Sequence, residues 1–319
     1  MRAAVVGSYG PPDHVTVAER PTPLPRAGEV LVRVAAVAVT SGDARLRAGR
    51  FPPGFGLLAR LAVGLRGPRR RILGGAFSGT VEGVAPGVTG FAPGDEVAGM
   101  TGTRLGGHAE FVAVPGASLV RKPAEVGHPA AAGVLFGGTT ALYFLRDRAK
   151  VRPGDAVLVN GASGAVGSSA VQLAKHFGAT VTAVTSTRNV DFVTGLGADQ
   201  VVDYTMTPVT TLTGPYDIVF DTVGNLSRAD GLSLLAPDGS LILAVASLAD
   251  IVAARRPVIT GSAPERADDF ALLLQLAASG QLDPVTEIVG GLDAVQEAHR
   301  RIDTGRKVGN LVILPGAAR

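Results

Sequence analysis

The sequence predicts an α/β protein of two domains, a β-rich domain followed by a doubly wound parallel sheet. The chain has 319 residues, of which 46% are hydrophobic and 18% are charged. It is therefore long enough for two cores and too apolar for a disordered chain. Short strand patterns fill its first third, and strands alternate with helices from Ala130 onward, which is typical of a parallel sheet.

The first third contains short β-branched runs that end at glycine and proline turns. Strands are predicted at 3–6, 15–19, 29–38, 77–84 and 108–114, and a further strand follows the turn at 93–95. Between them, residues 43–72 have helical and loop character without a clear periodicity.

The second part contains continuous Val, Ile and Leu runs, as expected for strands that are covered on both faces. Strands are predicted at 156–160, 180–185, 200–203, 218–221 and 240–244, and helices at 166–177 and 189–196. Two helices at 266–278 and 293–302 and a strand at 310–314 follow Pro264. On composition alone, these last elements complete either domain.

Several classes of site are excluded by composition. The chain has no cysteine, which excludes disulfides, thiolate nucleophiles and zinc sites with sulfur ligands. Its five histidines are scattered, so no metal is predicted. The N-terminus has no apolar stretch typical of export, and no run of eighteen apolar residues could span a bilayer. We therefore expect a cytoplasmic protein without a membrane partner.

The densest basic cluster is Arg66-Gly67-Pro68-Arg69-Arg70-Arg71, in a chain with a formal net charge of +3. A nucleic-acid site should add aromatic platforms or a known binding motif, and this segment has neither. We expect a solvated basic loop and no nucleic-acid partner. The alternative is a loop that borders a site for an anionic substrate.

A glycine-rich turn at residues 160–167, Asn-Gly-Ala-Ser-Gly-Ala-Val-Gly, joins a predicted buried strand to a predicted helix. In this setting the backbone approaches a pyrophosphate at the helix N-terminus. The turn departs from G-x-G-x-x-G because Ala162 stands in place of the first glycine, next to Gly161. The sequence therefore predicts a dinucleotide site; a glycine-rich turn without a ligand is the alternative.

The end of the next strand, Thr185-Ser186-Thr187-Arg188, predicts which dinucleotide binds. An NAD site expects a carboxylate here, and none is present. The hydroxyl groups can donate to a 2′-phosphate, and the guanidinium can pair with it bidentately. NADPH is therefore preferred over NADH. The alternative is that Arg188 only faces water at a helix start.

Together these motifs resemble the medium-chain dehydrogenase/reductase superfamily, on its zinc-lacking, zeta-crystallin-like quinone oxidoreductase branch. The matching segments cover nearly the whole chain: RAGEVLVRV at 26–34, FSGTVE at 77–82, PGDEV at 93–97, GHAEFV at 107–112, the glycine-rich turn, FDTVG at 220–224 and the tail from 280 to 312. The resemblance implies a GroES-like catalytic domain at 1–122 and 265–319, a Rossmann domain at 123–264, and a homodimer.

The resemblance also implies cofactor contacts, carried over by matching position. The pyrophosphate would lie on Ser163, Gly164, Ala165, Val166 and Gly167. The 2′-phosphate would lie on Ser186, Thr187 and Arg188, with Tyr204 beside it and Val223 near the adenosine. Thr140, Ala246 and Ser247 would surround the nicotinamide, and Asn310 in the tail is a further expected contact. For Tyr204 and Thr140, ordinary packing at a strand end and a helix start is the alternative.

The catalytic residues are expected in Thr40-Ser41-Gly42-Asp43, where relatives often carry Asn-x-x-Asp. The cofactor performs hydride transfer, so a site without metal suffices for an electrophilic acceptor such as a quinone or an α,β-unsaturated carbonyl. Simple ketones and alcohols generally need a Lewis acid or a positioned acid. The hydroxyl of Thr40 or Ser41, or water, would support the oxyanion and supply the proton, with Asp43 as the retained acid. Alternatively, Thr40 caps a turn and Asp43 starts a helix.

Three functions stay open at this point. A quinone reductase is expected first. An enone or enoyl reductase, acting on 2-alkenals or in biosynthetic tailoring, shares the same site logic. A non-catalytic NADPH-binding protein is the third, because Ala76 and Thr40 depart from the family pattern.

Overall fold

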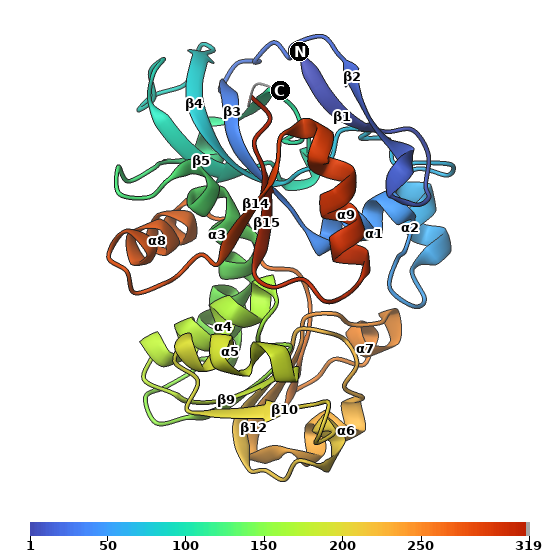
Figure 1. Ribbon diagram of the computed structural model, residues 1–319, viewed down its shortest axis with the longest axis vertical. Coiled ribbons are helices and arrows are strands. Elements are labelled where there is room, and N and C mark those ends of the chain that lie inside the picture. Colours follow the sequence, from blue (N-terminus) through green and yellow to red (C-terminus); the bar gives the residue numbers. More distant parts are fainter. Residues whose placement is uncertain (317–319) are drawn as a thin grey trace.

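The computed structural model describes residues 1–316, apart from the side chain of Leu57, and contains two large sheets at opposite ends of the molecule (Figure 1). One is a mixed sheet of seven strands, in the order β14-β15-β3-β4-β5-β7 with β6 also paired to β3. The other has six parallel strands in the order β10-β9-β8-β11-β12-β13. The strands β1 and β2 form a separate antiparallel pair. The predicted α/β fold class is confirmed.

The strands of the mixed sheet and the small pair are β1 Arg2–Val6, β2 Val15–Glu19, β3 Glu29–Val39, β4 Ala76–Val84, β5 Glu96–Met100, β6 Phe111–Pro115, β7 Leu119–Arg121, β14 Thr286–Gly290 and β15 Asn310–Ile313. The parallel strands are β8 Ala156–Asn160, β9 Thr180–Thr185, β10 Gln200–Asp203, β11 Tyr216–Asp221, β12 Leu235–Leu243 and β13 Val258–Ile259.

The α-helices are α1 Ser41–Ala48, α2 Gly56–Val63, α3 His128–Leu142, α4 Ala165–His176, α5 Val190–Gly195, α6 Arg228–Ser233, α7 Leu248–Val252, α8 Ala267–Ala278 and α9 Val295–Asp303. A π-helix, η4 Tyr143–Ala149, continues α3, and a 3-10 turn, η5 Thr187–Asn189, precedes α5. None of the helices in residues 1–316 is long and apolar enough to cross a membrane.

The parallel sheet is built from the apolar runs that the sequence analysis identified. The central strand β8 is buried from Val157 to Asn160, and β11 is buried from Ile218 to Asp221, because helices or loops cover both faces. The strand order reverses between β8 and β11, which pair directly. In open α/β sheets, ligands bind at such a reversal, beyond the carboxyl ends of the strands.

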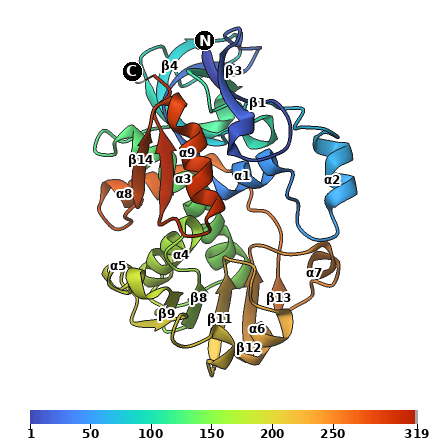
Figure 2. The ribbon, with the colours of Figure 1, turned by 45° about the vertical axis from the view of Figure 1, so that its right-hand side comes forward.

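Helix α3 joins the two sheets, and glycines on it permit unusually close packing. A Cβ atom at Gly137 would lie only 2.3 Å from the carbonyl oxygen of Ala165, the first residue of α4. A Cβ at Gly133 would lie 2.5 Å from Oγ1 of Thr286 on β14, and one at Gly138 would lie 2.9 Å from Leu273 on α8. The helix therefore contacts elements from both parts of the chain (Figure 2).

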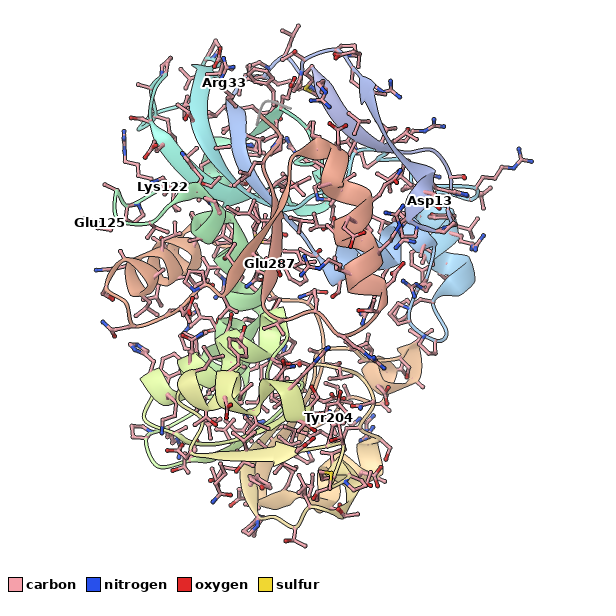
Figure 3. All side chains as sticks on the ribbon, in the orientation of Figure 1. Asp13, Arg33, Lys122, Glu125, Tyr204 and Glu287 are labelled. Atoms are coloured by element: carbon pink, nitrogen blue, oxygen red, sulfur yellow. The ribbon has the colours of Figure 1, made fainter. Side chains whose placement is uncertain are left out.

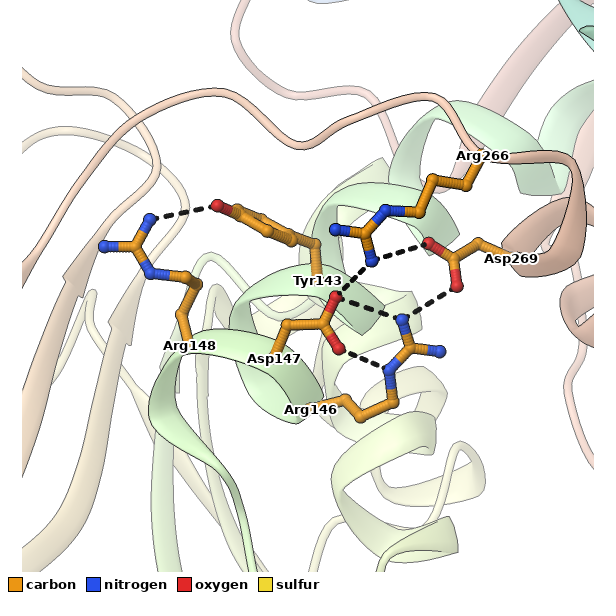
Figure 4. A network of polar contacts seen from close by, with 6 residues as sticks. All are labelled: Tyr143, Arg146, Asp147, Arg148, Arg266 and Asp269. Carbon is orange, nitrogen blue, oxygen red and sulfur yellow. Dashed lines mark hydrogen bonds and ion pairs between the residues drawn. The ribbon is translucent and has the colours of Figure 1, made fainter.

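An arginine–aspartate network ties the end of α3 to the segment that leaves the parallel sheet (Figure 4). Nε of Arg146 on η4 donates to Asp147 at 2.6 Å, and its Nη2 donates to Asp269 on α8 at 2.8 Å. Arg266 also donates to Asp147, at 2.8 Å. The hydrogen bond from Arg146 lowers the pKa of Asp147, so the network stays charged at neutral pH.

The C-terminal elements join the mixed sheet. Strand β15 pairs with β3, and β14 pairs with β15. Both sheets lie within the predicted domain ranges, whereas the boundaries at 122 and 264 stay a prediction.

The structure differs from the predicted elements at α3, which places Thr140 near a helix end, and at 108–114, where the strand begins only at Phe111. His108 is instead buried and contacts the Ala38 carbonyl oxygen at 3.1 Å.

We predict that Gly137→Ala lowers the melting temperature by about 3–10 °C, because overpacking of this kind costs about 1–3 kcal/mol. The added methyl group would collide with backbone that cannot move without shifting α4. Gly195→Ala is the matched control: it lies in α5 with open space around its Cβ, so it should leave the melting temperature unchanged or raise it. Thermal unfolding followed by circular dichroism measures both; equal melting temperatures would contradict the prediction.

Candidate functional site

A cavity of about 1200 Å³ lies between the two sheets. Its walls come from the end of β8 and the start of α4, the ends of β9 and β11, α1, α3, and the segments 50–53, 261–265 and 302–307. This volume exceeds the roughly 300–1000 Å³ of an ordinary small-molecule pocket. The cavity can thus hold a large ligand, or two ligands together.

The glycine-rich turn forms one wall, and two of its glycines, Gly161 and Gly167, have a steric reason. Gly161 has φ +83°, and a Cβ there would lie 2.5 Å from Val223. A Cβ at Gly167 would lie 2.1 Å from the carbonyl oxygen of Gly161. Ser163, Gly164, Ala165 and Val166 line the cavity, whereas Gly167 is buried behind them.

The first turn of α4 is open toward this wall. Its N-cap residue is Gly164, and no side chain caps the helix. The first N–H groups of a helix lack partners within it, and the helix dipole makes this end favourable for an anion. Ala165 and Val166 both line the cavity, so their N–H groups can serve a phosphate.

The end of β11 supports the same wall through Asp221. This fully buried carboxylate accepts from the N–H groups of Val223 and Gly224 and from Nδ2 of Asn160 at the end of β8. These bonds fix the turn that carries Val223, which lines the cavity and is 46% exposed. The predicted adenosine contact at Val223 therefore lies beside the glycine-rich turn.

The end of β9 brings two of its three predicted 2′-phosphate residues to the cavity. Ser186 and Arg188 line it, as does Tyr204, which is labelled in Figure 3. Thr187 does not line it; its hydroxyl donates to Asp203 at 2.5 Å. The sequence analysis did not consider Asp203, which comes from β10. The hydrogen bond from Thr187 lowers the pKa of this carboxyl, so it is charged but engaged.

The segment between α9 and β15 adds two cations that were not predicted from the sequence. Arg306 and Lys307 line the same end of the cavity, and the Arg306 carbonyl oxygen accepts from Nη2 of Arg188 at 2.8 Å. Lys307 is largely buried, and burial lowers its pKa to about 8. Its Nζ donates to the carbonyl oxygen of Gly309 at 2.5 Å, and no carboxylate in residues 1–316 forms an ion pair with it. An uncompensated buried ammonium is costly unless an anion binds beside it.

The predicted nicotinamide contacts are only partly brought together. Thr140 lines the cavity, but its hydroxyl donates to the Phe136 carbonyl oxygen at 2.8 Å. Ala246 and Ser247 are not in the cavity wall, because Ala246 is buried in a hydrophobic cluster and Ser247 caps α7. Asn310 is also absent from the wall; its Nδ2 donates to the Pro284 carbonyl oxygen.

The Thr40–Asp43 segment forms a capping box at the start of α1. The hydroxyl of Thr40 donates to Oδ2 of Asp43 at 2.6 Å and accepts from the Asp43 N–H at 3.2 Å. Asp43 is 4% exposed, and its Oδ1 accepts from the Gly74 N–H at 3.0 Å. The structure thus shows the capping arrangement that was the alternative for these two residues. Only Ser41 of the three predicted catalytic residues lines the cavity.

Ser41 shares the cavity wall with the apolar residues Met100, Phe136 and Phe144 and with the charged residues Arg45 and Glu265. Partial burial raises the pKa of Glu265, whose Oε2 accepts from the Gly102 N–H at 2.8 Å. In residues 1–316, no group of three or more acidic or histidine side chains could hold a metal ion. This end of the cavity suits an apolar, planar molecule.

Two family models match the chain. Residues 26–124 match the alcohol dehydrogenase GroES-like domain, and residues 196–313 match the zinc-binding dehydrogenase domain. The second match carries no zinc site with sulfur ligands over to this chain, because its sequence has no cysteine.

Three similar proteins cover most of the chain. The 2-methylene-furan-3-one reductase of Solanum lycopersicum is 30% identical, over 90% of this chain and 72% of that protein. The chloroplastic NADPH-dependent alkenal/one oxidoreductase of Arabidopsis thaliana is 28% identical, over 99% and 80%. The solved structure of the quinone oxidoreductase from Coxiella burnetii superposes with a TM-score of 0.88, at 28% identity, over 98% and 99%.

We predict that Lys307→Met stabilises the protein without ligand at pH 7, by about 1–3 kcal/mol. Below pH 8 the ammonium is charged in both the folded and the unfolded chain, so the cost of burying it is fully present. Between pH 8 and the ordinary pKa near 10.5, the unfolded chain binds more protons, and the wild type should gain stability as pH rises. The advantage of the variant should therefore shrink across this interval.

Denaturant unfolding of both proteins from pH 7 to pH 10.5 measures this difference. Lys175→Met is the control, since Lys175 forms an exposed ion pair with Asp199, and its loss should change stability by less than about 1 kcal/mol. A variant at Lys307 that is less stable than the wild type at pH 7 would refute the interpretation.

Proposed function

Because the chain belongs to the medium-chain dehydrogenase/reductase family, on its zinc-lacking quinone oxidoreductase branch, we propose that it is an NADPH-dependent oxidoreductase that reduces a quinone or an α,β-unsaturated carbonyl. The observation that carries the proposal is the cationic end of the cavity, where the uncapped start of α4 meets Arg188, Arg306 and Lys307. The names of the similar proteins support the two acceptor classes.

The chain's own residues fit a dinucleotide. Two close approaches, at Gly161 and Gly167, leave room for backbone but not for a Cβ, and the buried Lys307 has no carboxylate partner. We propose that the α4 N-terminus holds the pyrophosphate, and that Ser186 and Arg188 hold the 2′-phosphate with Lys307 nearby. NADPH, when bound, supplies the hydride. Asp203 keeps its negative charge, because Thr187 and Thr205 donate to it, so the cations Arg188, Arg306 and Lys307 have to outweigh it when a phosphate binds.

At the acceptor end, the apolar wall would hold a flat electrophile and exclude water from the reacting atoms. The hydroxyl proton of Thr40 is committed to Asp43, so we assign Thr40 and Asp43 to positioning α1. Ser41 lines the cavity, and its hydroxyl has no hydrogen-bond partner among residues 1–316. We propose that Ser41, or a water bound beside it, donates to the developing oxyanion and supplies the proton.

The proposal includes a homodimer in the cytoplasm. Strand β13, Val258–Ile259, is the last strand of the parallel sheet, and it pairs on one side only within residues 1–316. A second copy of the chain could continue the sheet there, which would cover an exposed edge. Sedimentation equilibrium and cell fractionation test these two points.

An enone reductase is the second candidate, and one observation favours it. Reduction of an activated alkene requires a proton at carbon as well as a hydride, and this cavity presents both the Ser41 hydroxyl and the Glu265 carboxyl, whose pKa is raised. A quinone needs protonation only at oxygen, which water can supply. The relative rates with the two acceptor classes therefore separate the candidates.

We predict that the protein oxidises NADPH in the presence of a quinone or a 2-alkenal, at least tenfold more efficiently than NADH. Arg188→Gln should raise the KM for NADPH about 10–100-fold and leave that for NADH nearly unchanged, because a charge-assisted pair with phosphate contributes about 1.5–3 kcal/mol. Arg148→Gln, which removes an exposed guanidinium bonded to Tyr143, is the control and should change neither KM.

Steady-state rates with a panel of quinones, enals and cyclic enones provide the measurement. Equal use of NADH and NADPH would refute the assignment of Arg188. Tight NADPH binding with no acceptor that oxidises it would favour a non-catalytic NADPH-binding protein instead.

We predict different outcomes for the two neighbouring hydroxyls. Ser41→Ala should lower kcat with an enone at least tenfold, with little change in stability. Thr40→Val should lower the free energy of unfolding by about 0.5–2 kcal/mol, the usual cost of losing an N-cap, while the folded fraction keeps most of its kcat. Turnover and chemical denaturation of both variants measure this contrast. Loss of turnover in a fully folded Thr40→Val protein, with Ser41→Ala active, would reverse the assignment.

A further inference from the structure

Helix α2 exposes apolar side chains that an ordinary surface helix would bury. Leu58 is 62% exposed and Leu61 is 52% exposed, and Leu65, just beyond the helix, is 62% exposed. The one charged residue of the helix, Arg60, is exposed as well, with its guanidinium 5.3 Å from the ring centroid of Tyr9. Surface helices normally turn their apolar side inward. Water is therefore a poor environment for the exposed face of α2.

Specific contacts hold this exposed segment in place. The Tyr9 hydroxyl donates to the Gly64 carbonyl oxygen at 2.8 Å, directly after the helix. The N–H of Arg69 donates to the Val63 carbonyl oxygen at 2.8 Å, and Nη2 of Arg69 donates to the Leu61 carbonyl oxygen at 3.1 Å. The segment is therefore fastened to the protein through its polar atoms, while Leu58, Leu61 and Leu65 remain exposed.

Positive charge surrounds these leucines. Arg66, Arg69, Arg70 and Arg71 are all exposed and follow α2 directly. No acidic residue occurs between Asp43 and Glu82. The surface thus combines exposed leucines with an uncompensated basic cluster. It is complementary to a partner that has an apolar interior and an anionic surface.

A bilayer that contains anionic lipids has both properties. Apolar side chains can enter the boundary of the acyl chains while guanidinium groups stay at the lipid phosphates. Each basic residue near the surface contributes about 1 kcal/mol to the free energy of membrane binding. A nucleic acid would match the arginines but would offer no medium for the leucines. The observations therefore favour a membrane surface over a nucleic acid.

This surface adjoins the acceptor end of the cavity. Phe51, Pro52 and Pro53, just before α2, line the cavity. The Pro53 carbonyl oxygen accepts from the N–H of Leu248 at 2.9 Å. At this point the segment before α2 meets helix α7, which follows strand β12 of the parallel sheet. Figures 1 and 2 both show α2 and α7 on the same side of the molecule. On α7, Val252 is 77% exposed, which extends the apolar area.

We propose that the leucine–arginine surface, formed by Leu58, Leu61, Leu65, Arg66, Arg69 and Arg70, docks on an anionic membrane surface and that apolar acceptors enter the cavity from there. The docking stands on this surface alone, whereas the entry of acceptors rests on the proposed function. No membrane partner was predicted, because the sequence shows no pattern typical of a spanning or an exported segment. The outward direction of the leucines is visible only in the structure.

Co-sedimentation with lipid vesicles tests the docking, using the full chain and vesicles of phosphatidylcholine with or without phosphatidylglycerol. We expect binding to the anionic vesicles that weakens with added salt, because salt screens exposed charges. Leu58→Ser with Leu61→Ser, and separately Arg66→Gln with Arg69→Gln and Arg70→Gln, should each lower the bound fraction at least tenfold. Leu24→Ser is the matched control, since Leu24 is 87% exposed outside this surface, and it should bind as the wild type does.

Activity measurements distinguish a failure of the docking proposal from a failure of the proposed function. With a water-soluble short-chain quinone and no vesicles, the leucine and arginine variants should keep the wild-type kcat/KM. With a long-chain quinone dissolved in anionic vesicles, their rates should fall at least fivefold. Vesicle binding without turnover of any acceptor would refute the proposed function and leave the docking intact; turnover without vesicle binding would refute the docking.

Three further results would overturn the docking proposal. One is equal binding to neutral and anionic vesicles, and another is unchanged binding by the leucine variant. The third is a different occupant of the surface. A leucine variant whose mass in analytical ultracentrifugation drops to that of a smaller assembly would show that a second copy of the chain covers the surface. Binding of duplex DNA in preference to vesicles would show a nucleic-acid partner. Unchanged melting temperatures confirm that each variant is folded.

Discussion

The close packing of α3 against the first turn of α4 is the contact on which the cavity depends. Gly137 lets the Ala165 carbonyl oxygen approach to a distance that no Cβ would permit, and Gly133 does the same for Thr286 of β14. One helix thereby sets the glycine-rich turn and the C-terminal return at fixed positions. As a result the N–H of Gly309 donates to the Ser163 carbonyl oxygen at 2.9 Å. The loop that would hold a pyrophosphate is thus bonded to the segment that carries Lys307.

This arrangement concentrates unfavourable charge before any ligand binds. The uncapped start of α4, the exposed guanidinium of Arg188 and the buried ammonium of Lys307 all present positive potential to one end of the cavity. Burial of the Lys307 ammonium costs stability, and an anion with several phosphate charges would recover it. The neighbouring carboxylate, Asp203, accepts from the Thr187 and Thr205 hydroxyls and stays charged, so its single charge offsets part of this potential. We therefore expect that this end of the cavity is less stable without a ligand and that it binds phosphate groups tightly.

The sequence predicted those features that depend on local chemistry, and it missed those that depend on packing. The β8–turn–α4 unit was found because its apolar run, glycines and helix follow one another in the chain. Helix α3 was not delimited, because its glycines and threonines lower its helix propensity and because it is apolar on most sides, which leaves no amphipathic periodicity. The burial of Lys307 and the approach of Asp203 to Thr187 join distant segments, which periodicity cannot reveal. The roles of Thr40 and Asp43 were left open because a capping box and a catalytic pair use the same residue types.

The two ends of the cavity are built from different kinds of structure, and this separates cofactor binding from acceptor choice. The phosphate end rests on strand termini and a helix start, whose positions are fixed by the parallel sheet. The acceptor end includes Phe51, Pro52 and Pro53, which belong to a segment attached to the rest of the protein by a few polar contacts and by the packing of Tyr9 against Phe51. Substitutions in residues 50–53, which line the cavity, can therefore reshape the acceptor wall without moving the glycine-rich turn. The exposed leucines and arginines begin only a few residues later and do not line the cavity, so where the protein binds can change without a change in which acceptors fit, although the two surfaces adjoin in the chain.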